Sequence, residues 1–250
     1  MSAPEAATGP LRKPVLVVQH TEVGAPGAVL PILQSLGAQV HLLRVVDGEP
    51  VPADPSPYAG LVLMGGYMGV HDPIPWIAQE LELIRRADAL GIPVAGHCLG
   101  SQMLAYALGG SVRKHTQQEI SWGEITAESG AAAGEWLGEY AGRTLETFQW
   151  HGDTFEPPPG AQRLASGRYC ANQMFSVGGK HLLVQSHLEM DPALIELSLA
   201  RNGALLEREV ALGNPAAANR AETLREMPAR TARMHAILRR LYTRWLGLAV

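Results

Sequence analysis

Cysteine is scarce in this sequence, with 2 residues in a chain of 250. So few cysteines exclude the disulfide framework that holds many small secreted domains together. The N-terminal segment MSAPEAATGPLRKP lacks the apolar core of a signal peptide, and no apolar run approaches the ~18 residues of a membrane span. These absences predict a soluble, cytoplasmic protein that does not contact a membrane. In that compartment a free thiol stays reduced and can act as a nucleophile.

Charge is also sparse, since charged residues make up 18% of the chain and the formal net charge is −4. A chain with this balance lacks the basic surface of a nucleic-acid binder. The hydrophobic share is 46%, and the length allows one large α/β domain or two small ones. Residues 201–250 differ from the rest, because they carry nine arginines against four acids.

The first half of the chain alternates short apolar runs with amphipathic segments. Continuous apolar strands of this kind are typical of a parallel sheet that is buried on both faces. We therefore predict an α/β fold with a mostly parallel central sheet and helices on both faces. The expected strands are 14–19, 38–46, 60–64 and 92–95, and the expected helices are 27–36, 75–90 and 99–108.

The pattern changes after residue 111. Alternating runs at 145–150 and 172–177 predict antiparallel or edge strands, and 181–186 predicts a mostly apolar strand. A helix is expected over 191–202, then a connector over 203–219 and a helical tail over 220–246. The predicted organisation is a flexible N-terminus (1–13), a main domain (14–203) and a C-terminal helical extension (204–250).

The sharpest local signal is the segment Gly96-His97-Cys98-Leu99-Gly100, between an expected strand and an expected helix. A glycine on each side of a central nucleophile, in strand–turn–helix context, is typical of a strained turn that exposes that residue. The helix N-terminus favours the thiolate. Cys98 is therefore the predicted nucleophile, whereas Cys170 lacks this context and is expected to be inert.

A cysteine nucleophile needs a base, and the base needs an orienting carboxylate. Two histidines are followed two residues later by an acid, in His151-Gly152-Asp153 and His187-Leu188-Glu189. In extended chain, residues i and i+2 point to the same side. His187 follows the more apolar strand, expected near the sheet centre, and is favoured over His151, which follows an alternating strand expected at an edge.

Three candidate elements would meet at one edge of a parallel sheet. Gly65-Gly66, Cys98 and His187 each follow a predicted strand, and ligands of open α/β sheets bind at the carboxyl ends of strands. The glycine turn and the Leu99 N–H could then stabilise a developing oxyanion. A dinucleotide loop is excluded because the G-x-G-x-x-G spacing is missing. A metal site from both histidine pairs is conceivable, but no spacing requires one.

Six sequence blocks resemble the class I (triad-type) glutamine amidotransferases, especially the stand-alone branch that resembles the amidotransferase domain of GMP synthase. They occur in the family's order and together cover roughly residues 14–200. The blocks are GGYMGVHD (65–72), PVAGHCLGSQMLA (93–105), EISWGEI (119–125), FQWHGDTFEPPPGA (148–161), CANQMF (170–175) and VQSHLEMDP (184–192).

The resemblance implies a flavodoxin-like fold, no cofactor and no metal, and a role for each matching position. The nucleophile falls on Cys98, and the histidine and acid of the triad fall on His187 and Glu189. The oxyanion hole would use the backbone N–H groups of Gly66 and Leu99. Contacts to glutamine would fall on Gln102 and on the four residues Trp150, His151, Gly152 and Asp153.

The sequence departs from the family's pattern at Tyr67 and Leu188, where the family usually has proline. The expected activity is cleavage of the glutamine side-chain amide through a cysteine thioester, with the ammonia passed to an acceptor or a synthetase. The alternative is a γ-glutamyl peptide or amide hydrolase that needs no synthetase. A binding protein that has kept the fold is a third hypothesis, against which the intact triad argues.

The tail 220–246 has apolar residues at helical spacing, with arginines over most of its remaining surface. Either this apolar stripe packs on the main domain, or part of it forms a homodimer or synthetase interface anchored by Trp245.

Overall fold

The computed structural model describes residues 13–249, so the flexible segment predicted for the N-terminus lies, apart from its last residue, outside the described part of the chain. From β1 to α3, every predicted element is present within two residues of its expected ends. These elements are β1 (Val15–Gln19), α1 (Val29–Ser35), β2 (Val40–Arg44), β3 (Gly60–Leu63), α2 (Pro75–Ala89), β4 (Val94–His97) and α3 (Leu99–Ala107).

One mixed sheet of nine strands runs through the described residues, in the order β2-β1-β3-β4-β9-β8-β7-β5-β6. The strands of its second half are β5 (Ser111–Ala127), β6 (Thr144–Glu156), β7 (Ala161–Gly167), β8 (Met174–Val177) and β9 (His181–Val184). Four pairings are parallel and four are antiparallel. The prediction of a mostly parallel sheet is therefore corrected to a mixed one. Most connections between residues 111 and 186 are short and carry no crossover helix, which parallel pairing would require.

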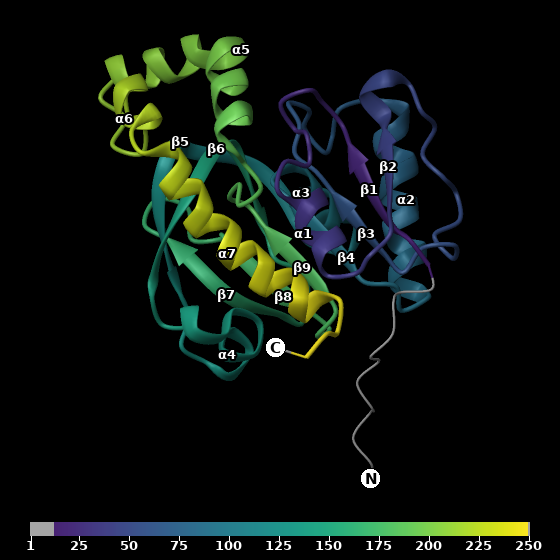
Figure 1. The fold of residues 1–250 in the computed structure, drawn as a ribbon. Helices are drawn as coiled ribbons and strands as arrows, with labels where there is room; N and C mark the ends of the chain where they lie inside the picture. The colour runs from purple at the N-terminus through teal and green to yellow at the C-terminus, as the bar shows by residue number, and fades with distance from the viewer. Residues whose placement is uncertain (1–12, 250) are drawn as a thin grey trace.

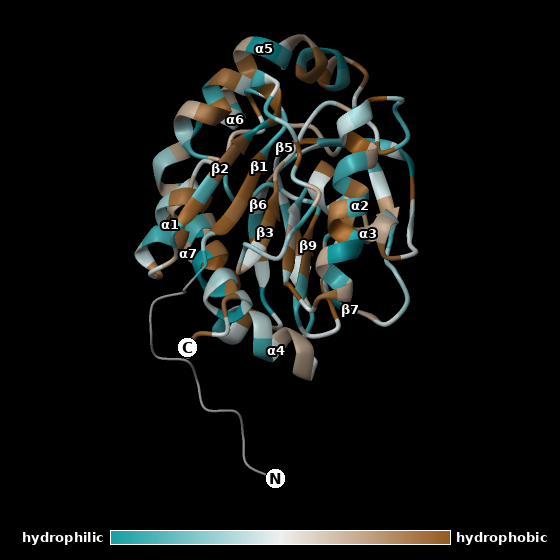
Figure 2. Cartoon of the chain, turned by 90° about the vertical axis from the view of Figure 1, so that its right-hand side faces the viewer, coloured by the Kyte–Doolittle hydropathy of each residue, from teal (hydrophilic) through white to brown (hydrophobic). Residues whose placement is uncertain are grey.

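Helices cover both faces of the parallel half of the sheet (Figure 2). Alternate residues of its strands point to the two sides. On one side Val15 and Val17 of β1 belong to a core that includes α1 and the C-terminal helices. On the other side Leu16 and Val18 belong to a core that includes α2 and α3. Burial on both faces explains why these strands read as continuous apolar runs.

The C-terminal part contains more helix than the sequence predicts. Helix α5 (Pro192–Ala211) continues past residue 203, where a connector was expected, because Leu206 extends its buried face. The expected tail helix is divided in two, since Glu226 adopts a left-handed conformation with φ of 52°. The remaining helices are α4 (Ala131–Leu137), α6 (Arg220–Leu224) and α7 (Met227–Trp245), with two short 3-10 turns at Val45–Asp47 and Gly138–Tyr140.

Helix α7 lies diagonally across one face of the sheet (Figure 1). Its apolar stripe, including Met234, Leu238 and Leu241, is fully buried in the core on that face. Trp245 is also buried, and an added Cβ on Gly60 would lie 2.5 Å from its ring. The tail thus packs on its own body, and Trp245 is not exposed as the alternative of an interface would require. Between residues 13 and 249, no helix is long and apolar enough to span a membrane.

Candidate active site

Cys98 lies in a strained turn between β4 and α3. Its φ of 47° is in the left-handed region, and its backbone N–H donates to the Val184 carbonyl at 2.8 Å. The flanking glycines have no room for a side chain: a Cβ on Gly96 would lie 2.4 Å from the Gly100 carbonyl carbon, and one on Gly100 would lie 2.1 Å from the Leu63 oxygen. This turn has the geometry predicted for a nucleophile between a strand and a helix.

The three strand ends meet as expected. β3, β4 and β9 are parallel neighbours, and β9 is the middle strand of the sheet. A Cβ added to Gly65 would lie 3.2 Å from Cε1 of His187 and 3.6 Å from Cβ of Cys98. The glycine turn, the thiol and the imidazole therefore share one small space.

His187 and Glu189 form a buried pair beside Cys98. Nδ1 of His187 lies 2.7 Å from Oε1 of Glu189, and Glu189 is 1% exposed. The outer nitrogen, Nε2, has no hydrogen-bond partner within residues 13–249. This leaves Nε2 available on the side of the thiol, where a general base is required.

The electrostatics of this pair favour a charged carboxylate and a strongly basic imidazole. Burial alone would raise the pKa of Glu189, but the charge and hydrogen bond of His187, together with the facing ring of His97, hold it well below its usual range. Burial alone would lower the pKa of His187, yet Glu189 and Cys98 raise it well above its usual value. An imidazole of this kind can donate a proton to a leaving amine near neutral pH.

The glycine turn after β3 is held from behind by a second buried histidine. Nδ1 of His20 lies 2.9 Å from the carbonyl oxygen of Met64, and Nε2 lies 2.9 Å from Glu80. The Met64 carbonyl can only accept, so Nδ1 of His20 donates to it. Burial alone would lower the pKa of His20, but Glu80 raises it above its usual value. The His20 ring thereby fixes Met64, the residue that precedes Gly65 and Gly66.

Two recesses share Cys98 in their lining. Gly66, Tyr67, Trp150 and Asn202 line both of them. The first recess is polar and holds the remaining predicted substrate contacts together with a lysine; its further lining includes Gln102, Lys114, His151, Gly152 and Asp153.

The second recess is on the side of His187 and is more apolar. Val23 and Met190 line it beside Trp150, and Tyr67 stands at the border of both recesses. The Tyr67 hydroxyl accepts a hydrogen bond from the side-chain amide of Asn202 in α5 at 3.2 Å, and Tyr67 is 61% exposed. The departure from the family's proline at this position therefore shapes the entrance.

The competing histidine pair is not assembled as the spacing suggests. Nε2 of His151 contacts Glu119 of β5 at 3.0 Å, whereas the carboxylate of Asp153 pairs with Lys114 at 2.8 Å. Nδ1 of His151 meets only the backbone oxygen of Asp153, at 3.0 Å. The i, i+2 argument fails here because β5 and β6 are paired, and the cross-strand partner is closer.

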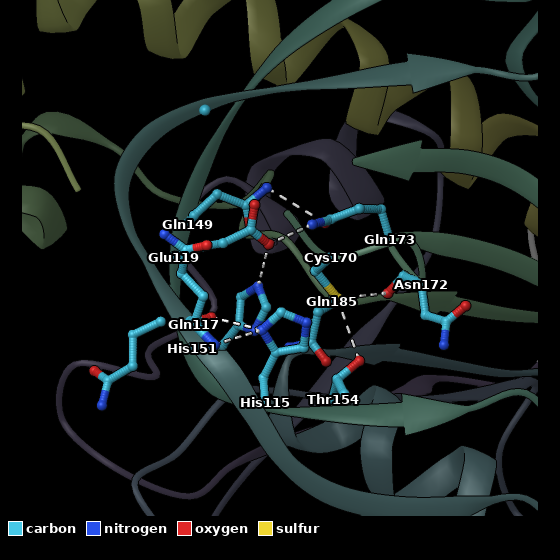
Figure 3. A network of polar contacts seen from close by, with 12 residues as sticks. His115, Gln117, Glu119, Gln149, His151, Thr154, Cys170, Asn172, Gln173 and Gln185 are labelled. Atoms are coloured by element: carbon cyan, nitrogen blue, oxygen red, sulfur yellow. Dashed lines mark hydrogen bonds and ion pairs between the residues drawn. The ribbon is translucent and has the colours of Figure 1, made fainter. Parts of the chain in front are cut away.

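Glu119 is the centre of a polar network that includes His151 and Gln173 (Figure 3). Its Oε2 also accepts from Gln173 at 2.8 Å. Glu119, His151 and Cys170 place one possible metal-ligand atom each within 4.8 Å of one another. Both nitrogens of His151 already face oxygen atoms, the backbone carbonyl of Asp153 and the carboxylate of Glu119.

The sequence did not single out several residues that contribute here. His97, the residue before Cys98, contacts Glu189 at 3.1 Å. Tyr242 and Asn202 were indistinguishable from other helix residues. Glu119 lies in one of the six sequence blocks that resemble the family, and this position is the feature of the sequence that could have identified it.

Comparisons with known proteins agree with this geometry. The sequence profile described as "Glutamine amidotransferase class-I" matches residues 27–205. Gamma-glutamyl peptidase 4 of Arabidopsis thaliana is 31% identical over 175 residues, which cover 68% of this chain and 70% of that protein. The glutamine-hydrolysing GMP synthase of Aromatoleum aromaticum is 32% identical over 120 residues, covering 45% of this chain and 22% of that protein. The crystal structure of a glutamine amidotransferase from Methylobacillus flagellatus, 34% identical, covers 95% of this chain and 96% of its own with a TM-score of 0.89.

Proposed function

Because this chain belongs to the class I glutamine amidotransferase family, we propose that it hydrolyses the side-chain amide of glutamine through a thioester on Cys98. One observation carries the proposal: Cys98 and His187 meet at the ends of adjacent parallel strands, and Glu189 orients His187 at 2.7 Å. A nucleophile, a base and an orienting carboxylate in this order form a complete triad.

The proposed reaction has two stages at the same atoms. The Cys98 thiolate attacks the γ-carbonyl carbon, and the N–H groups of Gly66 and Leu99 bind the oxyanion, each contributing ~3 kcal/mol in the transition state. Nε2 of His187 gives its proton to the leaving nitrogen as the C–N bond breaks. Nε2 then takes a proton from water, whose oxygen attacks the thioester; the C–S bond breaks and releases glutamate and the Cys98 thiolate.

The polar recess fits the amino-acid end of the substrate. The Lys114–Asp153 pair presents one cation and one anion, and these complement the α-carboxylate and α-ammonium groups of a glutamyl residue. Gln102 and His151 supply amide and ring groups to the same space. Lys114 is 87% exposed in its side chain and can reorient towards a ligand.

The apolar recess favours a second candidate, hydrolysis of γ-glutamyl peptides or amides without a synthetase. The leaving nitrogen must lie beside His187, and it is this side that Val23, Met190 and Trp150 line. Ammonia needs no such lining, whereas a substituted amine with an apolar group would bury its surface there. The γ-glutamyl peptidase among the relatives is consistent with this candidate.

A substrate panel tests both candidates. Ammonia release from glutamine and amine release from γ-glutamyl anilide and γ-glutamyl dipeptides are measured as kcat/KM. Activity that disappears in Cys98→Ala supports the proposed chemistry, and absence of activity on every compound would contradict it. Two results together select the second candidate. The wild type has a higher kcat/KM for the substituted amides than for glutamine, and Tyr67→Ala lowers kcat/KM for the substituted amides more than for glutamine.

A further inference from the structure

A buried chain of polar side chains continues behind the triad and ends on α7. Oε2 of Glu189 lies 3.1 Å from Nδ1 of His97, in an approach too far off line to count as a hydrogen bond. The other nitrogen of His97, Nε2, lies 2.9 Å from the hydroxyl of Tyr242. His97 and Tyr242 are fully buried. The rings of these two residues stack with centroids 6.1 Å apart.

The proton positions on His97 follow from its two neighbours, Glu189 and Tyr242. Glu189 is ionised and can only accept, so the nitrogen of His97 that faces it, Nδ1, must carry a proton. Burial and the charge of Glu189 raise the pKa of Tyr242 well above its usual value, so its hydroxyl keeps its proton. The Tyr242 hydroxyl can then donate to Nε2 of His97.

We propose that His97 and Tyr242 are positioning residues of this active site. The Tyr242 hydroxyl fixes the tautomer of His97 whose Nδ1–H faces Glu189, and this holds Glu189 ionised and aimed at His187. Tyr242 lies on α7, outside residues 27–205 that the family profile covers. The C-terminal helix therefore supports the triad directly, in addition to covering the sheet. The inference rests on the proposed roles of Cys98 and His187.

Few titratable groups face Glu189 and His187, so a change in the pH dependence of Cys98 can be traced to them. Glu189 is faced by His187, His97 and Tyr242, and His187 is faced by Glu189 and Cys98. If the carboxylate of Glu189 is no longer oriented towards His187, the imidazolium of His187 is less stable. The Cys98 thiolate that pairs with this imidazolium is then less stable too. The pH at which the thiol becomes reactive should then rise.

The test measures the rate of Cys98 alkylation by iodoacetamide against pH, in a Cys170→Ala background so that a single thiol reacts. Tyr242→Phe removes only the hydroxyl and should move the midpoint upward by about 0.5–1 pH unit, the effect of one buried hydrogen bond. Ile237→Val, a matched change in the buried face of α7, should lower thermal stability and leave the midpoint unchanged. An unchanged midpoint in Tyr242→Phe would overturn the proposal.

A second pair of variants tests His97, which lies between Glu189 and Tyr242. The side-chain amide of His97→Asn can present an N–H where Nδ1 now lies, and this variant should keep the midpoint within about 0.3 pH unit of the wild type. His97→Leu offers no N–H and should raise the midpoint at least as much as Tyr242→Phe. Equal midpoints in the two His97 variants would refute the proposal. Alkylation of Cys98 needs no substrate. If the protein hydrolyses none of the panel compounds, the proposed function is refuted, but the alkylation experiment still tests the roles of His97 and Tyr242.

Discussion

Replacing Gly100 with alanine should damage both stability and turnover, although Gly100 is a helical residue. Helix propensity alone favours alanine there by about 0.5–1 kcal/mol. The new Cβ, however, would lie 2.1 Å from the Leu63 carbonyl oxygen and 2.7 Å from its Cβ. Relief of this overlap requires α3 to move away from β3 by about 1 Å. Overpacking of this kind costs about 1–3 kcal/mol, which exceeds the propensity gain.

The displacement has a catalytic consequence because the first turn of α3 carries Leu99 directly after Cys98. A shift of about 1 Å between the nucleophile and the oxyanion donors should reduce kcat roughly 100-fold. A net loss of about 1–2 kcal/mol should lower Tm by roughly 2–8 °C in a chain of this size. Both effects are measured on the purified variant, by calorimetry and by turnover of whichever panel compound reacts fastest.

Gly134 provides the matched control for this substitution. It is also helical, in α4, and an added Cβ would meet nothing within 4 Å. Gly134→Ala should therefore increase the free energy of unfolding by about 0.5–1 kcal/mol and raise Tm slightly, with turnover unchanged. If both variants change Tm in the same direction, or if Gly100→Ala keeps full activity, the packing argument for the nucleophile turn is wrong.

Other predictions address the site and the tail. Cys98→Ala should abolish hydrolysis, whereas Cys170→Ala should leave it nearly intact; comparable losses in an ammonia-release assay would refute the assignment. His187→Ala should reduce kcat by orders of magnitude, whereas His151→Ala should mainly raise KM. Because the pKa of His187 is raised, proton donation should persist at neutral pH and be lost as pH rises through that raised value, seen as the alkaline limb of the kcat profile. Removal of 220–250 should prevent folding rather than leave a stable monomer, since each of the buried large side chains of α7 contributes about 1.5–3 kcal/mol; a soluble truncated protein with a cooperative melt would contradict this.

The first half of the fold could be predicted closely because its signals are local. The strands β1, β3 and β4 are apolar on both faces, and Pro75 marks the start of α2. The strand–turn–helix around Cys98 also follows from neighbouring residues. Parallel adjacency of β3, β4 and β9 then places the expected site residues together without further information.

The second half could not be predicted as well, because its structure depends on pairing. β5 is a 17-residue strand whose buried and exposed residues do not alternate regularly, and its register with β6 shifts between Lys114 and Glu119. That shift decides which side chain meets His151. Similarly, the contact between Glu189 and His97 joins the ends of two strands, and no sequence spacing encodes it.

The pairing of β4 with β9 has a consequence for how this protein acquires its site. Ala95 pairs with Leu182, so the chain must close a loop of almost ninety residues before the nucleophile and its base become neighbours. Loop closure of this length costs about 4 kcal/mol of chain entropy, and long-range pairings of this kind form slowly. The parallel strands β1, β2 and β3 can assemble earlier from shorter loops. During refolding, the circular dichroism of the helices and the burial of side chains around β1, β2 and β3 should therefore return in early phases. The native pH profile of Cys98 reactivity should return only in the slowest phase.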